Sequence, residues 1–210
     1  MIQVLVVDDH EIVRRGWTQI LGETDDIRVM GEASNTRDAM ELIRNGNWDV
    51  VVLDISMPGK SGIDLLKDLA RTHPDLAVLI SSIHPEDQYA VRVLRAGAAG
   101  YMNKDTASDE LVNAIRKVHR GGKYVSESLA QLMAFNLDDK RLGAPHEALS
   151  DREYQVLCML ASGKTSSQIA EQLALSPKTV STFRARILEK LALSNNAELI
   201  RYAIQHDLVQ

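Results

Sequence analysis

The sequence lacks the features that define several protein classes. A single cysteine, Cys158, among 210 residues excludes an intramolecular disulfide framework. No apolar run approaches the ~18 residues of a membrane span, and residues 1–9 enter a strand pattern without a basic leader. The hydrophobic fraction of 45% and the charged fraction of 25% exclude collagenous and disordered chains. We therefore expect a globular protein of the cytoplasm, without a secretory signal and without a membrane partner.

Positive charge is scarce in the chain as a whole, but it is unevenly distributed. Lys and Arg number 24 against 29 Asp and Glu, a net charge of −5. Residues 1–148 carry 17 basic and 23 acidic side chains, whereas residues 149–210 carry 7 and 6. Residues 177–190 alone hold four basic side chains and one acidic side chain, a local charge of +3. The acidic total therefore hides a basic element near the C-terminus.

The first 120 residues alternate short β-branched runs with amphipathic stretches. Strands are expected near residues 2–7, 27–33, 49–53, 76–81 and 99–102. Helices are expected near residues 11–22, 35–45, 61–72, 86–96 and 107–120. This alternation predicts right-handed βαβ units, and hence an α/β fold with a doubly wound, five-stranded parallel sheet that is covered on both faces.

Polar residues follow the carboxyl ends of four of these strands. Asp8 and Asp9 come after the first strand, Asp54 ends the third, Ser82 ends the fourth, and Lys104 follows the fifth. Because open α/β sheets bind ligands at this edge, we expect the five side chains to converge.

Three carboxylates held together repel one another unless a cation compensates their charge. Mg²⁺ takes carboxylate oxygens together with waters and a phosphoryl oxygen, so the cluster predicts a Mg²⁺ site. Lys104 would offer a point charge to a phosphoryl oxygen and Ser82 a hydrogen bond. Such a site suits phosphoryl transfer to a carboxylate.

The same residues resemble the receiver domain of bacterial two-component response regulators, which has a flavodoxin-like fold. The strings VLVVDDH, LDISMPGKSG and GYMNKD, with Ser82 between the last two, match that domain in order and spacing over about residues 1–120. The resemblance implies Mg²⁺ as cofactor and a sensor histidine kinase as the phosphoryl donor. It further implies that Asp54 is the phosphoacceptor, that Asp8, Asp9, Asp54 and the backbone carbonyl of Ser56 bind the metal, that Lys104 pairs with the phosphoryl group, and that Ser82 and Tyr101 form the switch pair.

Residues 121–148 have the glycine and proline content of a domain boundary. We expect a receiver domain over residues 1–122, a partly helical linker over 123–147 with a helix near 127–137, and a second domain over 148–210. From residue 149 onward the apolar period is 3.6, which predicts a small all-α domain with helices near 151–161, 166–173, 177–190 and 196–205. The short connection between the second and third of these helices, followed by Pro177, indicates a helix-turn-helix.

The helix expected over residues 177–190 has two different faces. Val180, Phe183, Ile187 and Leu191 make an apolar stripe that would pack on the domain core. The opposite face carries small, hydroxylated and basic side chains, as a helix that enters a major groove does: Lys178, Ser181, Thr182 and Ala185, with Arg186 at its flank.

This segment is similar to the LuxR-type helix-turn-helix of the NarL/FixJ family over about residues 147–210, on the string LSDREYQVLCMLASGKTSSQIAEQLALSPKTVSTFRARILEKL. The resemblance implies that Lys178 and Thr179 contact the DNA backbone. It implies that Ser181, Thr182 and Ala185 face the bases.

Both halves together predict a phosphorylation-activated, DNA-binding transcription regulator that is not an enzyme. Phosphorylation of Asp54 is expected to draw Ser82 toward the new oxygens and to let Tyr101 turn inward. It is further expected to favour a homodimer that binds promoter DNA. One alternative is a phosphatase or phosphotransferase with an aspartyl nucleophile and Mg²⁺. Another is a DNA-binding or adaptor protein that is independent of phosphorylation and has a vestigial receiver.

Overall fold

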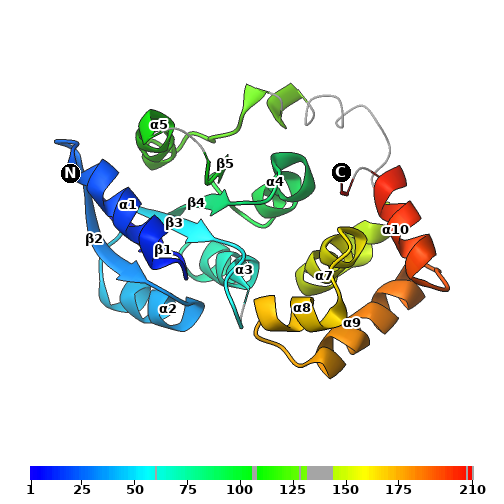
Figure 1. The fold of residues 1–210 in the computed structure, drawn as a ribbon. Helices are drawn as coiled ribbons and strands as arrows, with labels where there is room; N and C mark the ends of the chain where they lie inside the picture. Colours follow the sequence, from blue (N-terminus) through cyan, green and yellow to red (C-terminus); the bar gives the residue numbers. More distant parts are fainter. Residues whose placement is uncertain (60, 106–107, 128, 132–143, 207, 210) are drawn as a thin grey trace. The chain divides into compact units, whose positions relative to one another are not determined.

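The chain forms two compact units, residues 1–131 and residues 132–210 (Figure 1). The structure is a computed structural model and describes residues 1–59, 61–105, 108–127, 129–131, 144–206 and 208–209. Residues 132–137 of the predicted linker helix therefore lie outside the described residues. None of the helices in the described ranges has both the length and the hydropathy needed to cross a membrane.

The first unit contains the predicted five-stranded parallel sheet. Its strand order is β2-β1-β3-β4-β5, so the order reverses between β1 and β3. Ligands of doubly wound sheets bind at such a reversal, and the carboxyl ends of β1 and β3 lie on its two sides. The strands are β1 (Ile2–Val7), β2 (Ile27–Ala33), β3 (Val50–Asp54), β4 (Ala77–Ser82) and β5 (Gly100–Asn103).

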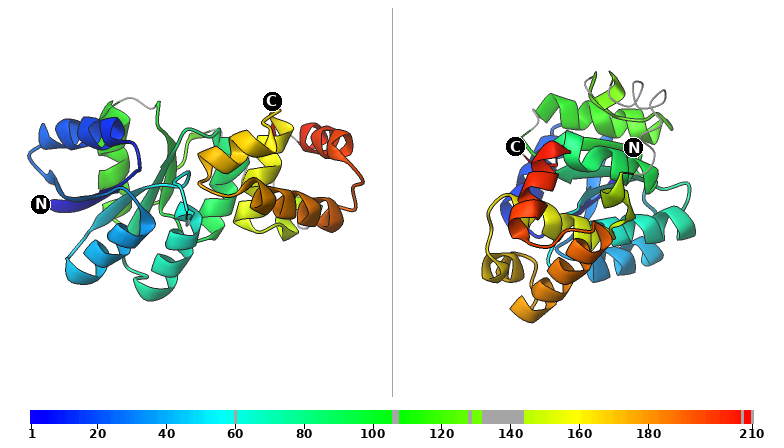
Figure 2. Two further views of the ribbon diagram at one scale, coloured as in Figure 1. Left: turned by 60° about the horizontal axis from the view of Figure 1, so that its bottom comes forward. Right: turned by 90° about the vertical axis from the view of Figure 1, so that its right-hand side faces the viewer.

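Helices cover both faces of this sheet, as the two-sided burial of β1 and β3 requires (Figures 1 and 2). On one face, Trp17 and Leu21 of α1 and Leu111 and Ile115 of α5 share a core with the valines of β1 and β3. Helices α2 and α3 cover the other face, and α4 packs against β5. The helices are α1 (Glu11–Gly22), α2 (Thr36–Asn45), α3 (Gly62–Thr72), α4 (Glu86–Arg95) and α5 (Ser108–His119).

The chain that leaves α5 covers the outer edge of β5. The amide of Tyr101 donates to the Tyr124 carbonyl at 3.0 Å, and the Tyr124 amide donates to Ala99 at 2.9 Å. A β-carbon on Gly100 would lie 2.6 Å from the Tyr124 carbonyl oxygen, so this close pairing requires glycine. The sequence places residues 123–131 in the linker, whereas the first unit extends to residue 131, and Tyr124 of this segment pairs with the edge of its sheet.

Helices are the only regular secondary structure in the described residues of the second unit. Side chains cap the N-termini of its four α-helices, including capping boxes at Ser150 with Glu153 and at Thr165 with Gln168. Helices α8 and α9 form the predicted helix-turn-helix, and a short 3₁₀ helix, η1, lies in the segment assigned to the linker. The elements are η1 (Pro145–Ala148), α7 (Asp151–Ala161), α8 (Ser166–Gln172), α9 (Pro177–Lys190) and α10 (Asn196–Gln205).

Helix α9 ends in a left-handed residue that is not glycine. Ala192 has φ 53°, and the amide of Leu193 closes the turn onto the Leu188 carbonyl at 2.8 Å. Ala192→Gly should stabilise the second unit by about 1 kcal/mol because glycine adopts this conformation without strain. Ala185→Gly, an exposed site in the middle of the same helix, should destabilise it by a similar amount, about 1 kcal/mol. Hydrogen exchange of α7 and α9 peptides in the full chain measures the stability change of each variant. Stability changes of the same sign in the two variants would contradict the assignment of Ala192 as the left-handed cap residue.

Candidate phosphorylation site and DNA-facing helix

Four side chains at the point where the strand order reverses form a compact acidic cluster. Ligand atoms of Asp8, Asp9, His10 and Asp54 all lie within 4.8 Å of one another. Asp8 and Asp54 are fully buried, whereas the Asp9 side chain is 24% exposed and gives the cluster access to solvent. The structure thus brings the three predicted carboxylates together. It adds His10, which the sequence analysis did not name and whose Nδ1 lies 3.0 Å from Asp9 Oδ1.

Lys104 compensates part of this negative charge. Its Nζ lies 2.7 Å from Oδ2 of Asp8 and 2.7 Å from Oδ2 of Asp54, and its side chain is only 7% exposed. Burial raises the pKa of the Asp54 carboxyl above its ordinary value, and this effect outweighs the opposing effect of Lys104. Burial alone would lower the pKa of Lys104, but the two carboxylates raise it. Lys104 is therefore charged at neutral pH and lies between two buried acidic groups.

The loop after β3 holds the carboxylate of Asp54 in place. The Ser56 amide donates to Asp54 Oδ1 at 2.8 Å, so the residue whose carbonyl is a predicted metal ligand also orients Asp54. Helix α3 begins directly against this loop, and a β-carbon on Gly62 would lie 2.1 Å from the Asp54 carbonyl oxygen. The contact requires glycine at position 62.

The predicted switch residues Ser82 and Tyr101 meet at the backbone of His84. Ser82 Oγ accepts a hydrogen bond from the His84 amide at 3.1 Å, and the Tyr101 hydroxyl donates to the His84 carbonyl at 2.7 Å. Tyr101 is 1% exposed, so its ring is already inside the unit in this structure. The neighbouring Ser81 is the register partner of Asp54, whereas Ser82 lies one residue farther toward the carboxyl edge of the sheet.

The chemistry of the acidic cluster fits a hard divalent cation. Carboxylate oxygens and a backbone carbonyl are the ligands that Mg²⁺ prefers, together with water and phosphoryl oxygens. The buried hydroxyl of Ser56 has no hydrogen-bond partner among the described residues, and Asp9 Oδ1 has only the ion-pair contact with His10. A bound ion with its waters would satisfy oxygens of this kind and reduce the repulsion between the carboxylates.

Helix α9 presents the predicted DNA-facing residues on one side. Val180 and Ile187 are fully buried against the rest of the unit, as the apolar stripe predicts, whereas Phe183 is only half-buried. Thr179 is partly buried, and its Oγ1 lies 2.8 Å from the Oγ of Ser176 in the helix cap. The other predicted residues are exposed: Lys178, Ser181, Thr182, Ala185 and Arg186.

The hydroxyls of this face are oriented by the helix itself. Ser181 Oγ donates to the Pro177 carbonyl and Thr182 Oγ1 donates to the Lys178 carbonyl, both at 3.0 Å. Each hydroxyl oxygen can therefore accept a hydrogen bond from a base, and the Thr182 methyl group can contact a thymine methyl.

Not all basic residues of α9 are available to a ligand. Lys190 Nζ lies 2.7 Å from the buried Glu153 carboxylate of α7, and Arg184 Nε donates to Asn196 Oδ1 at 2.5 Å. These contacts join α9 to the helices beside it. Lys190 is still exposed and Arg184 faces a neutral amide, but both are held by these contacts, so Lys178 and Arg186 are the basic side chains of α9 best placed to contact a ligand.

The contact between Glu153 and Lys190 predicts a pH-dependent stability. Burial raises the pKa of Glu153, but hydrogen bonds from Lys190 and Ser150 outweigh burial and lower it overall. A carboxylate with a lowered pKa stabilises the fold above its unfolded pKa, roughly 4.3, and this contribution is lost as the pH falls through the folded pKa. Glu153→Gln should cost about 1–2 kcal/mol at pH 7 and progressively less below pH ~4. Hydrogen exchange of α7 and α9 peptides measures this difference, and a cost that does not change with pH would contradict it.

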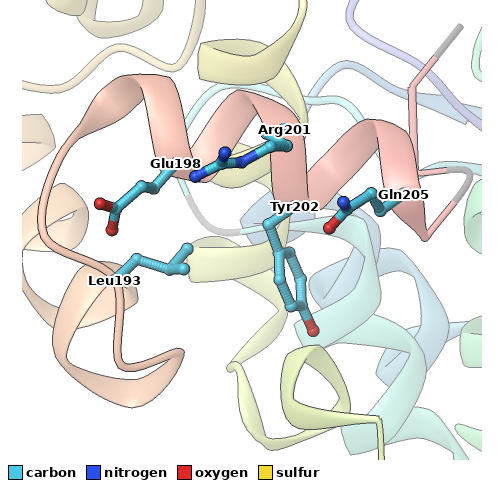
Figure 3. Close-up of a pocket in the computed structure, with 5 residues that line it drawn as sticks. All are labelled: Leu193, Glu198, Arg201, Tyr202 and Gln205. Carbon is cyan, nitrogen blue, oxygen red and sulfur yellow. The ribbon is translucent and has the colours of Figure 1, made fainter.

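A pocket of about 320 Å³ lies on α10 (Figure 3). Glu198, Arg201, Tyr202 and Gln205 project from one face of the helix, and Leu193 comes from the preceding loop. The Glu198 carboxylate accepts from the Ser194 amide at 2.7 Å, and the Tyr202 hydroxyl accepts from the His146 amide at 3.2 Å. These two polar groups hold α10 and η1 in place, and the pocket contains none of the predicted site residues.

Comparisons with known proteins divide the chain in the same way. Residues 4–116 match the response regulator receiver domain, and residues 147–203 match the bacterial regulatory proteins of the luxR family. The response regulator UvrY of Escherichia coli K12 is 41% identical over 209 residues, which are 99% of this chain and 96% of that protein. The response regulator GacA of Pseudomonas aeruginosa is 40% identical over 210 residues, or 100% and 98% of the two chains.

A solved structure is similar over nearly the whole length. RcsB from Salmonella enterica serovar Typhimurium, bound to the promoter rprA in the presence of the phosphomimetic BeF3⁻, superposes with a TM-score of 0.66 at 28% identity. The match covers 96% of this chain and 97% of that one. The expectations of a doubly wound parallel sheet and of a C-terminal helix-turn-helix domain are confirmed.

Proposed function

The chain belongs to the response regulators that join a receiver domain to a LuxR-family DNA-binding domain, and from this premise we propose that a phosphoryl group on Asp54 controls its binding to promoter DNA. A protein of this family regulates transcription in response to phosphorylation. The observation that carries the assignment to Asp54 is its position: its buried carboxylate lies in the acidic cluster, 2.7 Å from Lys104.

Each residue of the site has a part in this proposal. Asp8, Asp9, Asp54 and the Ser56 carbonyl would hold Mg²⁺, which would supply positive charge beside the transferring phosphoryl group. A carboxylate oxygen of Asp54 attacks the phosphorus of a phosphohistidine on a sensor histidine kinase; an O–P bond forms, the P–N bond breaks, and the kinase histidine leaves with a proton on the released nitrogen. Lys104 then pairs with a phosphoryl oxygen, and Ser82 turns from the His84 amide to donate a hydrogen bond to another.

The phosphorylated receiver favours a homodimer, and two copies of α9 then enter successive major grooves of promoter DNA. Lys178 and Arg186 neutralise phosphates, while Ser181, Thr182 and Ala185 face the base edges. The Tyr101 ring is already buried in the first unit. Phosphorylation therefore stabilises the inward position of this ring.

DNA binding by the full chain tests the proposal. A duplex selected from a random pool serves as the probe, and beryllofluoride with Mg²⁺ mimics the phosphoryl group. Beryllofluoride should tighten binding of the wild-type chain at least tenfold, roughly the coupling typical of an allosteric effector, and should increase the dimer fraction in light scattering. Asp54→Ala should show neither effect. Lys178→Ala should reduce by about 1 the magnitude of the slope of the logarithm of DNA affinity against the logarithm of salt concentration. If Asp54→Ala responded like the wild type, the vestigial-receiver alternative would be favoured.

Turnover separates this function from the phosphatase alternative. Glu198 and Tyr202 of the α10 pocket are engaged in structural hydrogen bonds, and the pocket contains no residue of the acidic cluster, so we propose that the chain does not turn over phosphate esters. In the presence of Mg²⁺, the wild type should release no more nitrophenol from p-nitrophenyl phosphate than Asp54→Ala does. Repeated turnover that depends on Asp54 would establish the enzyme instead.

A further inference from the structure

Arg14 of α1 contacts the backbone of the acidic cluster from outside. Its Nη1 donates to the Asp8 carbonyl at 2.7 Å, and its Nε donates to Glu32 Oε2 at 3.3 Å. The side chain is only 14% exposed, although it belongs to a helix on the surface of the unit. None of the roles assigned above uses this arginine.

The contact fixes the peptide that joins the two acidic residues. The Asp8 carbonyl belongs to the Asp8–Asp9 peptide, so its orientation determines how both carboxylates leave the backbone. On its other side, the Asp8 amide donates to the Ala33 carbonyl of β2 at 3.0 Å. The residue is therefore held by β2 at its N–H and by Arg14 at its C=O.

A second set of contacts holds Arg14 itself. Glu32 accepts the Arg14 Nε on one carboxylate oxygen and the Thr18 hydroxyl, at 3.1 Å, on the other. The guanidinium is thus placed between β2 and the Asp8 carbonyl, with a restricted set of rotamers. Groups that orient metal ligands in this way typically change metal affinity ~10–100-fold when they are removed.

We propose that Arg14 is a positioning residue for the divalent-cation site, acting through the Asp8–Asp9 peptide. The inference rests on the proposed function, because it needs the acidic cluster to bind Mg²⁺. Under this proposal, removal of Arg14 changes the affinity for Mg²⁺ in the direction opposite to that expected from simple electrostatics. The positive charge of Arg14 repels a cation, so losing charge alone would tighten Mg²⁺ binding, whereas losing the positioning contact weakens it.

The neighbouring Arg15 provides a matched control. Its Nη2 pairs with Glu11 on the outer side of α1 at 2.6 Å, and its side chain is 77% exposed. Arg14→Met and Arg15→Met remove the same charge from adjacent positions of the same helix. Only Arg14→Met removes the contact with Asp8.

The test is the affinity of the full-length chain for Mg²⁺, measured by titration calorimetry at constant ionic strength. Arg14→Met should bind Mg²⁺ about tenfold more weakly than wild type. Arg15→Met should bind at least as tightly as wild type, and Arg14→Lys, which keeps the charge and one donor, should lie between Arg14→Met and wild type. Saturating Mg²⁺ should return the acetyl phosphate labelling rate of Arg14→Met to within about twofold of wild type, as expected for a defect in binding alone.

Urea denaturation provides a separate readout of a merely structural role. Both tryptophans of the chain, Trp17 and Trp48, lie in the first unit, so their fluorescence follows the unfolding of that unit. If Arg14→Met lost stability but bound Mg²⁺ as tightly as Arg15→Met, the inference would be wrong. Absence of Mg²⁺ binding in the wild type would instead overturn the proposed function, and the inference with it.

Discussion

Lys104→Met should destabilise the first unit by about 3 kcal/mol in the presence of EDTA, and added Mg²⁺ should restore most of that loss. The lysine pairs with two buried carboxylates at 2.7 Å each, and its removal takes away the ammonium group that Asp8 and Asp54 share. Breaking a buried ion pair by removing one partner typically costs roughly 3–5 kcal/mol. We expect the lower end of this range because the Asp9 side chain is 24% exposed and solvent therefore reaches the cluster.

Urea denaturation followed by tryptophan fluorescence measures this effect in the first unit alone. The double variant Lys104→Met with Asp54→Asn should recover much of the stability in EDTA, because it removes one of the repelling charges. Lys67→Met, at an exposed lysine of α3, controls for the loss of a charge and should change stability by no more than about 0.5 kcal/mol. A loss of equal size with and without Mg²⁺ would show that Lys104 does not act by compensating the cluster.

Gly62→Ala should disrupt the loop that carries Asp54, with a cost of about 3 kcal/mol or more and a loss of phosphoryl uptake. A β-carbon at this position would lie 2.1 Å from the Asp54 carbonyl oxygen and 2.8 Å from the Ile55 α-carbon. Both contacts are with backbone atoms, which cannot rotate away as a flexible side chain can. The start of α3 must therefore move away from β3, and Asp54 loses the loop geometry that orients its carboxylate.

Gly16→Ala is the matched control for this change. Gly16 lies inside α1, and a β-carbon there meets no atom within 4 Å. The same added methyl group should stabilise the unit by roughly 0.5–1 kcal/mol, because alanine is the better helix former. Tryptophan-monitored denaturation and acetyl phosphate labelling should move together for Gly62→Ala, and neither should fall for Gly16→Ala. A Gly62→Ala chain with wild-type stability would contradict the close contact between α3 and β3.

The strands and helices were predictable because their patterns depend on local burial. Continuously apolar runs at 4–7 and 50–53 indicate strands buried on both faces, and these runs form most of β1 and most of β3. The convergence of Asp8, Asp54 and Lys104 followed from topology, since parallel strands bring their carboxyl ends to one edge. Pro177 indicated where the third helix of the second unit begins, and α9 does begin at that residue.

Contacts made by tertiary packing were not predictable in the same way. Arg14 follows a helical pattern in the sequence, and nothing local shows that its guanidinium meets the Asp8 carbonyl. The pairing of Tyr124 with β5 has the same origin, because the free edge of a strand exists only in the folded sheet. His10 was visible in the string VLVVDDH, beside two predicted ligands, and its position could have identified it.

Charge composition gave an incomplete account of the DNA-facing helix. A count assigns four basic residues to α9, but Lys190 pairs with Glu153 and Arg184 with Asn196 inside the second unit. Only the folded structure separates side chains that hold helices together from those that face outward. The proposed phosphate contacts therefore rest on Lys178 and Arg186.

We propose that Asp54 accepts a phosphoryl group in a site completed by Mg²⁺. The experiment that tests this is the intact mass of wild type and Asp54→Ala after incubation with acetyl phosphate, with and without Mg²⁺, combined with light scattering of the same samples. We predict one phosphoryl adduct that requires both Asp54 and Mg²⁺, together with a shift toward dimer. An adduct of equal yield in Asp54→Ala, or no adduct in wild type under any condition, would contradict the account.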